Sequence, residues 1–227
     1  IVGKYTGHAD AYLSVLKALT HSGIHLAVYV KIVWVDAGEL TSHDSTSDAY
    51  TALKECQGVV VPGGFGSRGV EGKIVATEYC RTHKIPLLGV CLGMQVMVME
   101  FARNVLGIPM ATSEEFSNTK VASRGTLDGN DCDQQDVKAD PAVPGGDVGD
   151  GDKKNVIVFM PEGSKDKMGG TMRVGARATL IKPGSLAATV YNIKGNEDGP
   201  RHHVIMERHR HRYEVDPHAV LSFEKAG

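Results

Sequence analysis

A short stretch in the middle of the chain constrains the fold most, because it joins an apolar strand to a long apolar helix through a tight turn. The strand is expected at 87–90, and residues 92–106 are apolar almost all round, as in a helix buried on most faces. The turn between them, residues 89–93, reads GVCLG. A nucleophile flanked by glycines on a strand-to-helix turn is typical of a nucleophile elbow, here with Cys91 in place of serine.

The shape of this turn suggests its chemistry. Gly89 and Gly93 stand two residues before and two after Cys91, where so tight a turn leaves no room for side chains. The turn would place the sulfur at a helix N-terminus, whose dipole and free N–H groups favour the thiolate. The N–H of Leu92 would point at an oxyanion on the attacked carbonyl. A buried structural cysteine between two packing glycines is the alternative interpretation.

A glycine-rich loop favours the catalytic interpretation. Residues 62–66 read PGGFG and directly follow an expected buried strand at 58–61. Glycines let a backbone approach a ligand closely. In an open α/β sheet, loops at the carboxyl ends of neighbouring strands share one crevice. We therefore expect this loop to face Cys91 and to supply a second oxyanion donor.

The first part of the chain alternates strands with helices. Strands are expected at 2–5, 28–35, 58–61 and 87–90. Helices are expected from a cap at Asp10 to a stop at Gly23, and from about Val70 to His83. Strands without clean alternation, separated by helices, indicate a parallel sheet covered on both sides. We predict a flavodoxin-like α/β fold with an open, mostly parallel sheet, helices on both faces, and Cys91 at the end of a buried central strand.

An acidic insertion interrupts this order. Residues 117–155 contain no aromatic side chain, and eight aspartates fall between 128 and 152. Such a segment cannot bury enough apolar surface to offset its ordering entropy. We predict a solvated, disordered loop within a single domain that spans 1–227. Calcium binding is disfavoured because the aspartates lack the EF-hand spacing. Strands are expected again at 156–160 and 204–215, and after a turn that begins at 169.

Composition and charge exclude several functions. The formal net charge of −2 and the pI of about 6.6 argue against nucleic-acid binding through bulk electrostatics. No apolar run approaches the roughly 20 residues that a membrane span needs. The four cysteines form no CxxC pair, and their spacing fits neither a zinc site nor a disulfide framework. A reduced, cytoplasmic compartment is therefore expected.

With these motifs in place, the chain resembles a known family. Residues 62–66 (PGGFG) with 71–73 (EGK), and residues 89–95 (GVCLGMQ), resemble a class I glutamine amidotransferase. Within that class the chain resembles the glutaminase domain of the CTP synthase family. The stretches that carry this closer resemblance are 113–116 (SEEF), 168–173 (MGGTMR) and 207–215 (ERHRHRYEV), with 2–5 (VGKY) and 10–12 (DAY) near the start.

The resemblance implies a set of site residues. Cys91 would attack the side-chain carbonyl of glutamine, which releases ammonia and leaves a γ-glutamyl thioester. Gly64 and Leu92 would donate to the oxyanion, and the α-amino and α-carboxylate groups would be held by charged and amide side chains. The implied substrate-binding residues are Gly64, Leu92, Gly93, Met94, Gln95, Glu115 and Arg212. We expect the Glu115 carboxylate and the Arg212 guanidinium within about 10 Å of the sulfur, because amino-acid pockets are compact.

The resemblance also indicates a departure. The family places its catalytic His and Glu in a His-Pro-Glu motif, which residues 1–227 do not contain. His209 and His211 belong to the ERHRHRYEV stretch and are not candidates for the base. Because the sequence begins at Ile1 without Met, we expect a piece of a longer enzyme. We expect these residues alone to hydrolyse glutamine slowly.

The family relationship further implies cofactors and partners. No cofactor or metal is expected in this domain. ATP, Mg²⁺ and UTP would bind a synthetase domain that precedes it in the same protein, and GTP would be an allosteric activator. The expected partners are L-glutamine, that synthetase domain and further copies in a homotetramer, with no nucleic acid and no membrane.

Two alternative functions stay open. One is another class I cysteine hydrolase, such as a γ-glutamyl hydrolase, and the other is a non-catalytic glutamine-binding module. Glu115 and Arg212 distinguish a glutaminase from the first alternative, because binding a free amino acid requires an opposite charge for its α-ammonium and for its α-carboxylate group. Labelling of Cys91 by a glutamine-analogue electrophile separates the second, since an inert module would not react.

Overall fold

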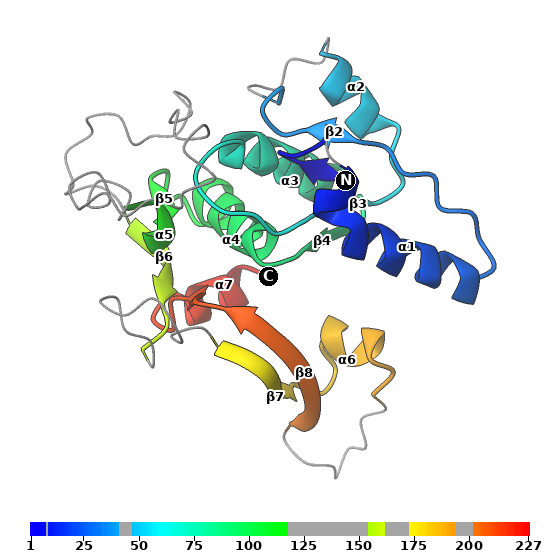
Figure 1. The fold of residues 1–227 in the computed structure, drawn as a ribbon. Coiled ribbons are helices and arrows are strands. Elements are labelled where there is room, and N and C mark those ends of the chain that lie inside the picture. The colour runs from blue at the N-terminus through cyan, green and yellow to red at the C-terminus, as the bar shows by residue number, and fades with distance from the viewer. Residues whose placement is uncertain (8, 41–46, 118–153, 162–172, 194–201) are drawn as a thin grey trace, which may run out of the picture. The chain divides into compact units, whose positions relative to one another are not determined.

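The computed structural model describes residues 1–7, 9–40, 47–117, 154–161, 173–193 and 202–227 (Figure 1). They form two compact units, the first made of residues 1–158 and 214–227 and the second of residues 159–213. The prediction of one domain over 1–227 stays a prediction. The expected acidic loop falls almost entirely on residues 118–153, outside the described residues, as does the expected turn at 169.

The first unit alternates short strands with helices, in an α/β arrangement (Figure 1). Its elements are β1 (Val2–Gly3), η1 (Ala9–Tyr12), α1 (Leu13–His25), β2 (Val35–Asp36), α2 (Asp48–Lys54), β3 (Val59–Val61), α3 (Val70–His83), β4 (Leu87–Gly89), α4 (Leu92–Asn104), β5 (Ala111–Ser113), α5 (Glu114–Ser117), β6 (Lys154–Phe159), β9 (Tyr213–Val215) and α7 (Val220–Ala226). The second unit contains β7 (Arg173–Ile181), α6 (Leu186–Val190) and β8 (His203–His211).

Parallel pairing dominates the first unit. β1 pairs with β2, β3 with β4 and β5 with β6, all in parallel, and β9 lies on the other side of β6. The α/β fold class with parallel sheets is thus confirmed. Its core contains Val2, Val35, Leu53 and Val61 from the strands and α2, with Tyr79 from α3. The apolar strands form this core together with the helices packed on them, as expected for a parallel sheet that is covered by helices.

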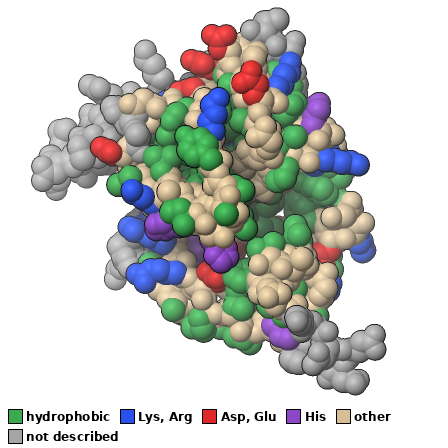
Figure 2. Space-filling view, turned by 90° about the vertical axis from the view of Figure 1, so that its right-hand side faces the viewer, with side chains coloured by type: hydrophobic (Ala, Val, Ile, Leu, Met, Phe, Trp, Pro, Cys, Tyr) green, Lys and Arg blue, Asp and Glu red, His purple; other side chains and the backbone are tan. Residues whose placement is uncertain are grey.

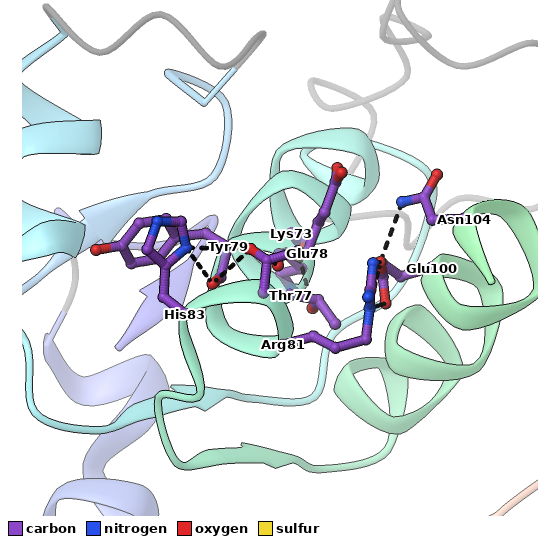
Figure 3. Close-up of polar contacts among 9 residues, drawn as sticks. Lys73, Thr77, Glu78, Tyr79, Arg81, His83, Glu100 and Asn104 are labelled. Carbon is purple, nitrogen blue, oxygen red and sulfur yellow. Dashed lines mark hydrogen bonds and ion pairs between the residues drawn. The ribbon is translucent and has the colours of Figure 1, made fainter. Parts of the chain in front are cut away.

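Helices α3 and α4 lie side by side (Figure 3). Helix α4 begins immediately after Cys91. The prediction of α3 is confirmed at both ends, Val70 and His83. Arg81 of α3 donates to both carboxylate oxygens of the buried Glu100 on α4, and Asn104 donates to the same carboxylate at 3.0 Å. This ion pair fixes the two helices against each other at the end remote from Cys91.

Three local expectations about the first unit are wrong. Asp10 does not cap α1, which begins at Leu13 without a side-chain cap. Gly23 does not end that helix, because it lies buried against Val28 and Val30, and the chain reverses later at Ala27 with a φ of 53°. The strand expected at 28–35 is reduced to β2, because only its last residues reach the core while Tyr29 is 92% exposed.

The strand before Cys91 also differs from expectation. β4 was expected to be buried and central, yet Leu88 is 58% exposed. Among the described strands, β4 is hydrogen-bonded to β3 alone, so it lies at an edge of this pairing. β4 pairs with β3 in a parallel register that places Val61 opposite Gly89. That register places the two strand ends, and the loops that follow them, side by side.

The second unit is built on one long antiparallel ladder. β7 and β8 pair over their full lengths, from Arg173 opposite His211 to Ile181 opposite His203. The strand expected at 204–215 is present as β8 and β9, with a break at Arg212. Burial alternates along β8, as predicted for a half-buried strand, but Val204 and Met206 are on its exposed side. Figure 2 likewise shows apolar side chains at the surface, interspersed with Lys, Arg and His.

Candidate active site

Cys91 occupies the strand-to-helix turn that the sequence predicts. It follows β4, stands immediately before α4, and has φ 55° and ψ −109°, which is rare for a residue with a side chain. A Cβ on Gly93 would come within 1.9 Å of the Val61 carbonyl oxygen, and one on Gly89 within 2.5 Å of the Met97 sulfur. The positions two residues before and two residues after Cys91 must therefore be glycine, which confirms the steric argument for the tight turn.

The glycine-rich loop after β3 faces this turn. A Cβ on Gly63 would lie 3.3 Å from the Cys91 Cβ and 3.9 Å from its sulfur. A Cβ on Gly64 would lie 3.5 Å from the Leu92 side chain. The expected proximity of the two loops is confirmed. The Gly64 backbone and the first turn of α4 therefore lie close together beside Cys91.

An amide–hydroxyl–carboxylate network joins α4 to β5 and α5. Gln95 is buried in α4 and donates to Glu115 at 2.9 Å. The Ser113 hydroxyl is fully buried and donates to the side-chain amide oxygen of Gln95 at 2.8 Å. The same hydroxyl accepts from the backbone N–H of Glu115 at 3.2 Å. These contacts fix the Gln95 amide and orient the Glu115 carboxylate. The structure therefore brings Gln95 and Glu115 together, as the resemblance implied.

The electrostatics of Cys91 differ from the expectation of a favoured thiolate. Its residue surface is exposed overall, but the sulfur lies against the Gly63 loop and is partly withdrawn from water. This burial raises the pKa of the Cys91 thiol above its ordinary value. The backbone N–H of Leu92 and the Lys73 ammonium oppose that rise in pKa, while the Glu115 carboxylate adds to it. The helix N-terminus contributes in the expected direction, but burial outweighs it.

A cluster of cations lies next to the Gly63–Gly66 loop. Lys4 is 5% exposed and donates to the Phe65 carbonyl, and Arg68 donates to the Lys4 carbonyl at 2.9 Å. Lys73 of α3 is fully buried, and a Cβ on Gly64 would lie 3.9 Å from its Nζ. Burial lowers the pKa of Lys73 to about 8, with Lys4 and Arg68 lowering it further and Cys91 raising it. This positive cluster lies next to the loop that faces Cys91.

The remaining site residues are placed less completely. Gly93 and Met94 lie in the first turn of α4, next to Cys91. Arg212 follows β8 in the second unit, so its proximity to Cys91 stays a prediction. His209 and His211 are on β8 and contact each other, with 3.0 Å between ring nitrogens. The part of the chain that the structure describes contains no group of three metal-ligating side chains.

Sequence reasoning missed two residues that the structure places at the site. Ser113 was part of a matching stretch without a role, and its position two residues before Glu115 was the available signal. Lys73 was likewise quoted without a role. It stands three residues after the buried Val70 and four before the buried Thr77, so it falls on the apolar face of α3. A lysine at such a position is the signal for a buried charge.

Comparison with known proteins agrees with this geometry. Residues 8–227 match the family described as glutamine amidotransferase class-I. The CTP synthases of Gibberella zeae and Eremothecium gossypii are 40% and 41% identical to this chain over 233 residues, covering all of it and 34% of each relative. The solved glutaminase domain of Trypanosoma brucei CTPS, with bound acivicin, is 33% identical with a TM-score of 0.68, over all of this chain and 70% of that one.

The Cys91 turn opposite a glycine-rich loop on a parallel sheet, together with these matches, defines the class: the chain belongs to the class I glutamine amidotransferase family. Within that family its sequence and fold group it with the glutaminase domains of CTP synthases. The chain spans about a third of the length of the curated CTP synthases that it matches, 34% for the two named here. No described helix is both long and apolar enough to cross a bilayer.

Proposed function

We propose that this chain is the glutaminase part of a CTP synthase, which hydrolyses L-glutamine and supplies ammonia for the amination of UTP to CTP. The observation that carries the proposal is the Cys91 turn, held by Gly89 and Gly93 and faced by the Gly63–Gly64 loop. This geometry puts the Cys91 sulfur beside the Gly63–Gly64 loop and directly before the first turn of α4. It supports acyl transfer from a carboxamide rather than a purely structural role for the cysteine.

In the proposed reaction the Cys91 thiolate forms a bond to the amide carbon of glutamine, and the carbonyl electrons move to the oxygen. The Leu92 N–H and the Gly64 backbone stabilise that oxyanion. When the tetrahedral intermediate collapses, the C–N bond breaks and the nitrogen leaves as ammonia with an added proton. The γ-glutamyl thioester on Cys91 then reacts with water, which gives glutamate and restores the thiol. By resemblance, the base that moves these protons belongs to the His-Pro-Glu motif, outside residues 1–227.

Recognition of a free amino acid is proposed for the Gln95–Ser113–Glu115 network. The Glu115 carboxylate suits an α-ammonium group, and Gln95 and Ser113 hold it in place. Arg212 would take the α-carboxylate through two parallel hydrogen bonds. A γ-glutamyl hydrolase would not need both charges, so the carboxylate beside Cys91 supports a glutaminase over that alternative.

The proposal also includes the wider assembly. By family resemblance, ATP, Mg²⁺ and UTP would bind a synthetase domain of the same protein, and GTP would activate the glutaminase. Homotetramers and a cytoplasmic location belong to the same proposal. The described residues provide only the glutamine side of this scheme.

The test is covalent labelling with a chloroketone analogue of L-glutamine, followed by peptide mass spectrometry. We expect label on Cys91, protection by L-glutamine, and no label at this position in Cys91→Ser. Glu115→Gln should slow this labelling at least about tenfold, because it loses a charge-assisted contact with the α-ammonium group. Labelling without protection by glutamine, or unchanged labelling in Glu115→Gln, would contradict a glutamine site.

A further inference from the structure

Lys73 is the most unusual charged residue of the first unit. Its side chain projects from α3 (Figure 3), and it has no exposed surface. Among the described residues its Nζ atom has no hydrogen-bond acceptor. Burying a cation without an acceptor costs several kcal/mol, so buried lysines normally have a partner or lose their proton. Packing alone does not explain a lysine here, because a methionine would fill the same volume at lower cost.

The surroundings of Lys73 identify the negative group that is missing. Its Nζ is 3.9 Å from the Cβ position of Gly64, on the loop that faces the sulfur of Cys91. Two other cations lie nearby, but both donate to backbone carbonyls: Lys4 to Phe65 and Arg68 to Lys4. Cys91 is the group whose charge favours the protonated form of Lys73. The anion that would compensate Lys73 is therefore one that forms at Cys91.

The charges that face Cys91 come from three elements. The Leu92 N–H of α4 and the Lys73 ammonium of α3 favour the thiolate, whereas the Glu115 carboxylate of α5 disfavours it. If the substrate ammonium occupies Glu115, that opposition is neutralised, and Lys73 is left as the full charge that acts on the sulfur. The pKa of Lys73, lowered to about 8, keeps it mostly protonated at neutral pH.

We propose that Lys73 is a positioning residue for the nucleophile, whose buried ammonium stabilises the negative charge on the Cys91 sulfur through the Gly63–Gly64 loop. The proposal rests on the proposed function, in which Cys91 attacks glutamine. Lys73 touches neither substrate nor product in this role. Its charge acts on the sulfur across the loop, in a buried region where water screens it little.

The experiment measures alkylation of Cys91 by iodoacetamide as a function of pH, followed at the Cys91 peptide by mass spectrometry. In Lys73→Met the profile should move to higher pH, and the rate at pH 8 should fall about threefold to tenfold. The limiting rate at high pH should match that of the unaltered chain, because the thiolate itself is the same. Cys56 in the same chain serves as an internal control, and its rate should not change.

Arg68→Met is the matched variant, because it removes a neighbouring cation of the same cluster that lowers the pKa of Lys73. Its Cys91 profile should not move to higher pH, because loss of Arg68 only raises the pKa of Lys73 and so extends the protonated form of Lys73. Overlapping profiles for Lys73→Met and the unaltered chain, or equal shifts in the two variants, would overturn the proposal. A purely structural role for Lys73 would change the melting temperature but not the midpoint of the profile.

Two further measurements keep the test decisive. Lys73→Gln removes the same charge and replaces Lys73→Met if that variant does not melt cooperatively. If neither variant folds, the test uses the unaltered chain. Lys73 loses its proton near pH 8, so its favourable effect on the Cys91 thiolate fades as the pH rises. The plot of log rate against pH should therefore have a slope below one between pH 8 and about 10. A slope of one there would overturn the proposal. Iodoacetamide needs no glutamine pocket, so these results are independent of the chloroketone test.

Discussion

The turn around Cys91 in the first unit and the β7–β8 ladder in the second unit are held by different kinds of contact. The turn depends on backbone atoms that approach so closely that only glycine fits at Gly89 and Gly93. The ladder depends on regular pairing between two strands, and a Cβ on its Gly175 would meet nothing within 4 Å. The comparison shows why the first region specifies one geometry for a side chain, whereas the second tolerates change along its length.

Replacing glycines in the two regions should give the largest difference. Gly93→Ala forces a Cβ to within 1.9 Å of the Val61 carbonyl, so the strand and the helix must separate, at a cost of more than about 3 kcal/mol. Gly175→Ala has open space but a φ of +86°, which costs about 1 to 2 kcal/mol. Urea unfolding of the two variants checks this order. Equal losses would show that the turn is not sterically determined.

Replacing the buried Lys73 by methionine should raise the stability, whereas the two glycine replacements should lower it. The pKa of Lys73 falls from 10.5 in the unfolded chain to about 8 in the fold, so the unfolded state binds more protons between these values and the stability rises with pH there. Below pH 8 both states carry the charge and the full penalty remains. Lys73→Met should therefore gain about 3 kcal/mol at pH 7 and lose this rise in stability with pH.

The control for this prediction lies in the second unit. Lys182 is exposed, and Lys182→Met should leave the stability within about 0.5 kcal/mol of the unaltered chain. Thermal unfolding of both variants at pH 7 and pH 10 is the measurement. A loss of stability in Lys73→Met would mean that Lys73 has a compensating partner in the fold.

Breaking one polar contact in each unit should give the smallest of these effects. Arg81→Ala leaves the Glu100 carboxylate, 1% exposed, without its cation, and should cost about 2 kcal/mol because Arg81 itself is partly solvated. Tyr191→Phe removes the exposed hydrogen bond to Glu207 and should stay within about 0.5 kcal/mol. Thermal unfolding of the two variants compares them. Similar losses would remove the energetic distinction between the helix pair and the ladder.

The sequence predicted the parts of the fold in which local pattern and packing agree. Helix α3 and the turn at Cys91 were predictable because apolar spacing and glycine positions have steric causes that act locally. The strand expected at 28–35 was not, because β-branched residues favour a strand only where neighbours cover them, and Tyr29 is exposed. Gly23 was wrongly predicted to end the helix, because glycine is needed there for the close approach of Val28 and Val30 and not for a helix stop.

The same distinction applies to the site. Cys91, Gln95 and Glu115 could be named from motifs, and the loop at Gly63–Gly64 from the rule on strand ends. The raised pKa of Cys91 could not, since it depends on how far the loop covers the sulfur. Lys73 was missed for a related reason, because sequence patterns treat lysine as a surface residue. Burial of charge is a property of tertiary packing.

The central claim is that Cys91 accepts the γ-glutamyl group of glutamine. The most direct test incubates the chain with isotopically labelled L-glutamine, stops the reaction with acid, and searches the Cys91 peptide by mass spectrometry. We predict a γ-glutamyl adduct on Cys91 that hydroxylamine removes and that Cys91→Ser does not form. Ammonia release that persists in Cys91→Ser, or an adduct on a different residue, would contradict the account.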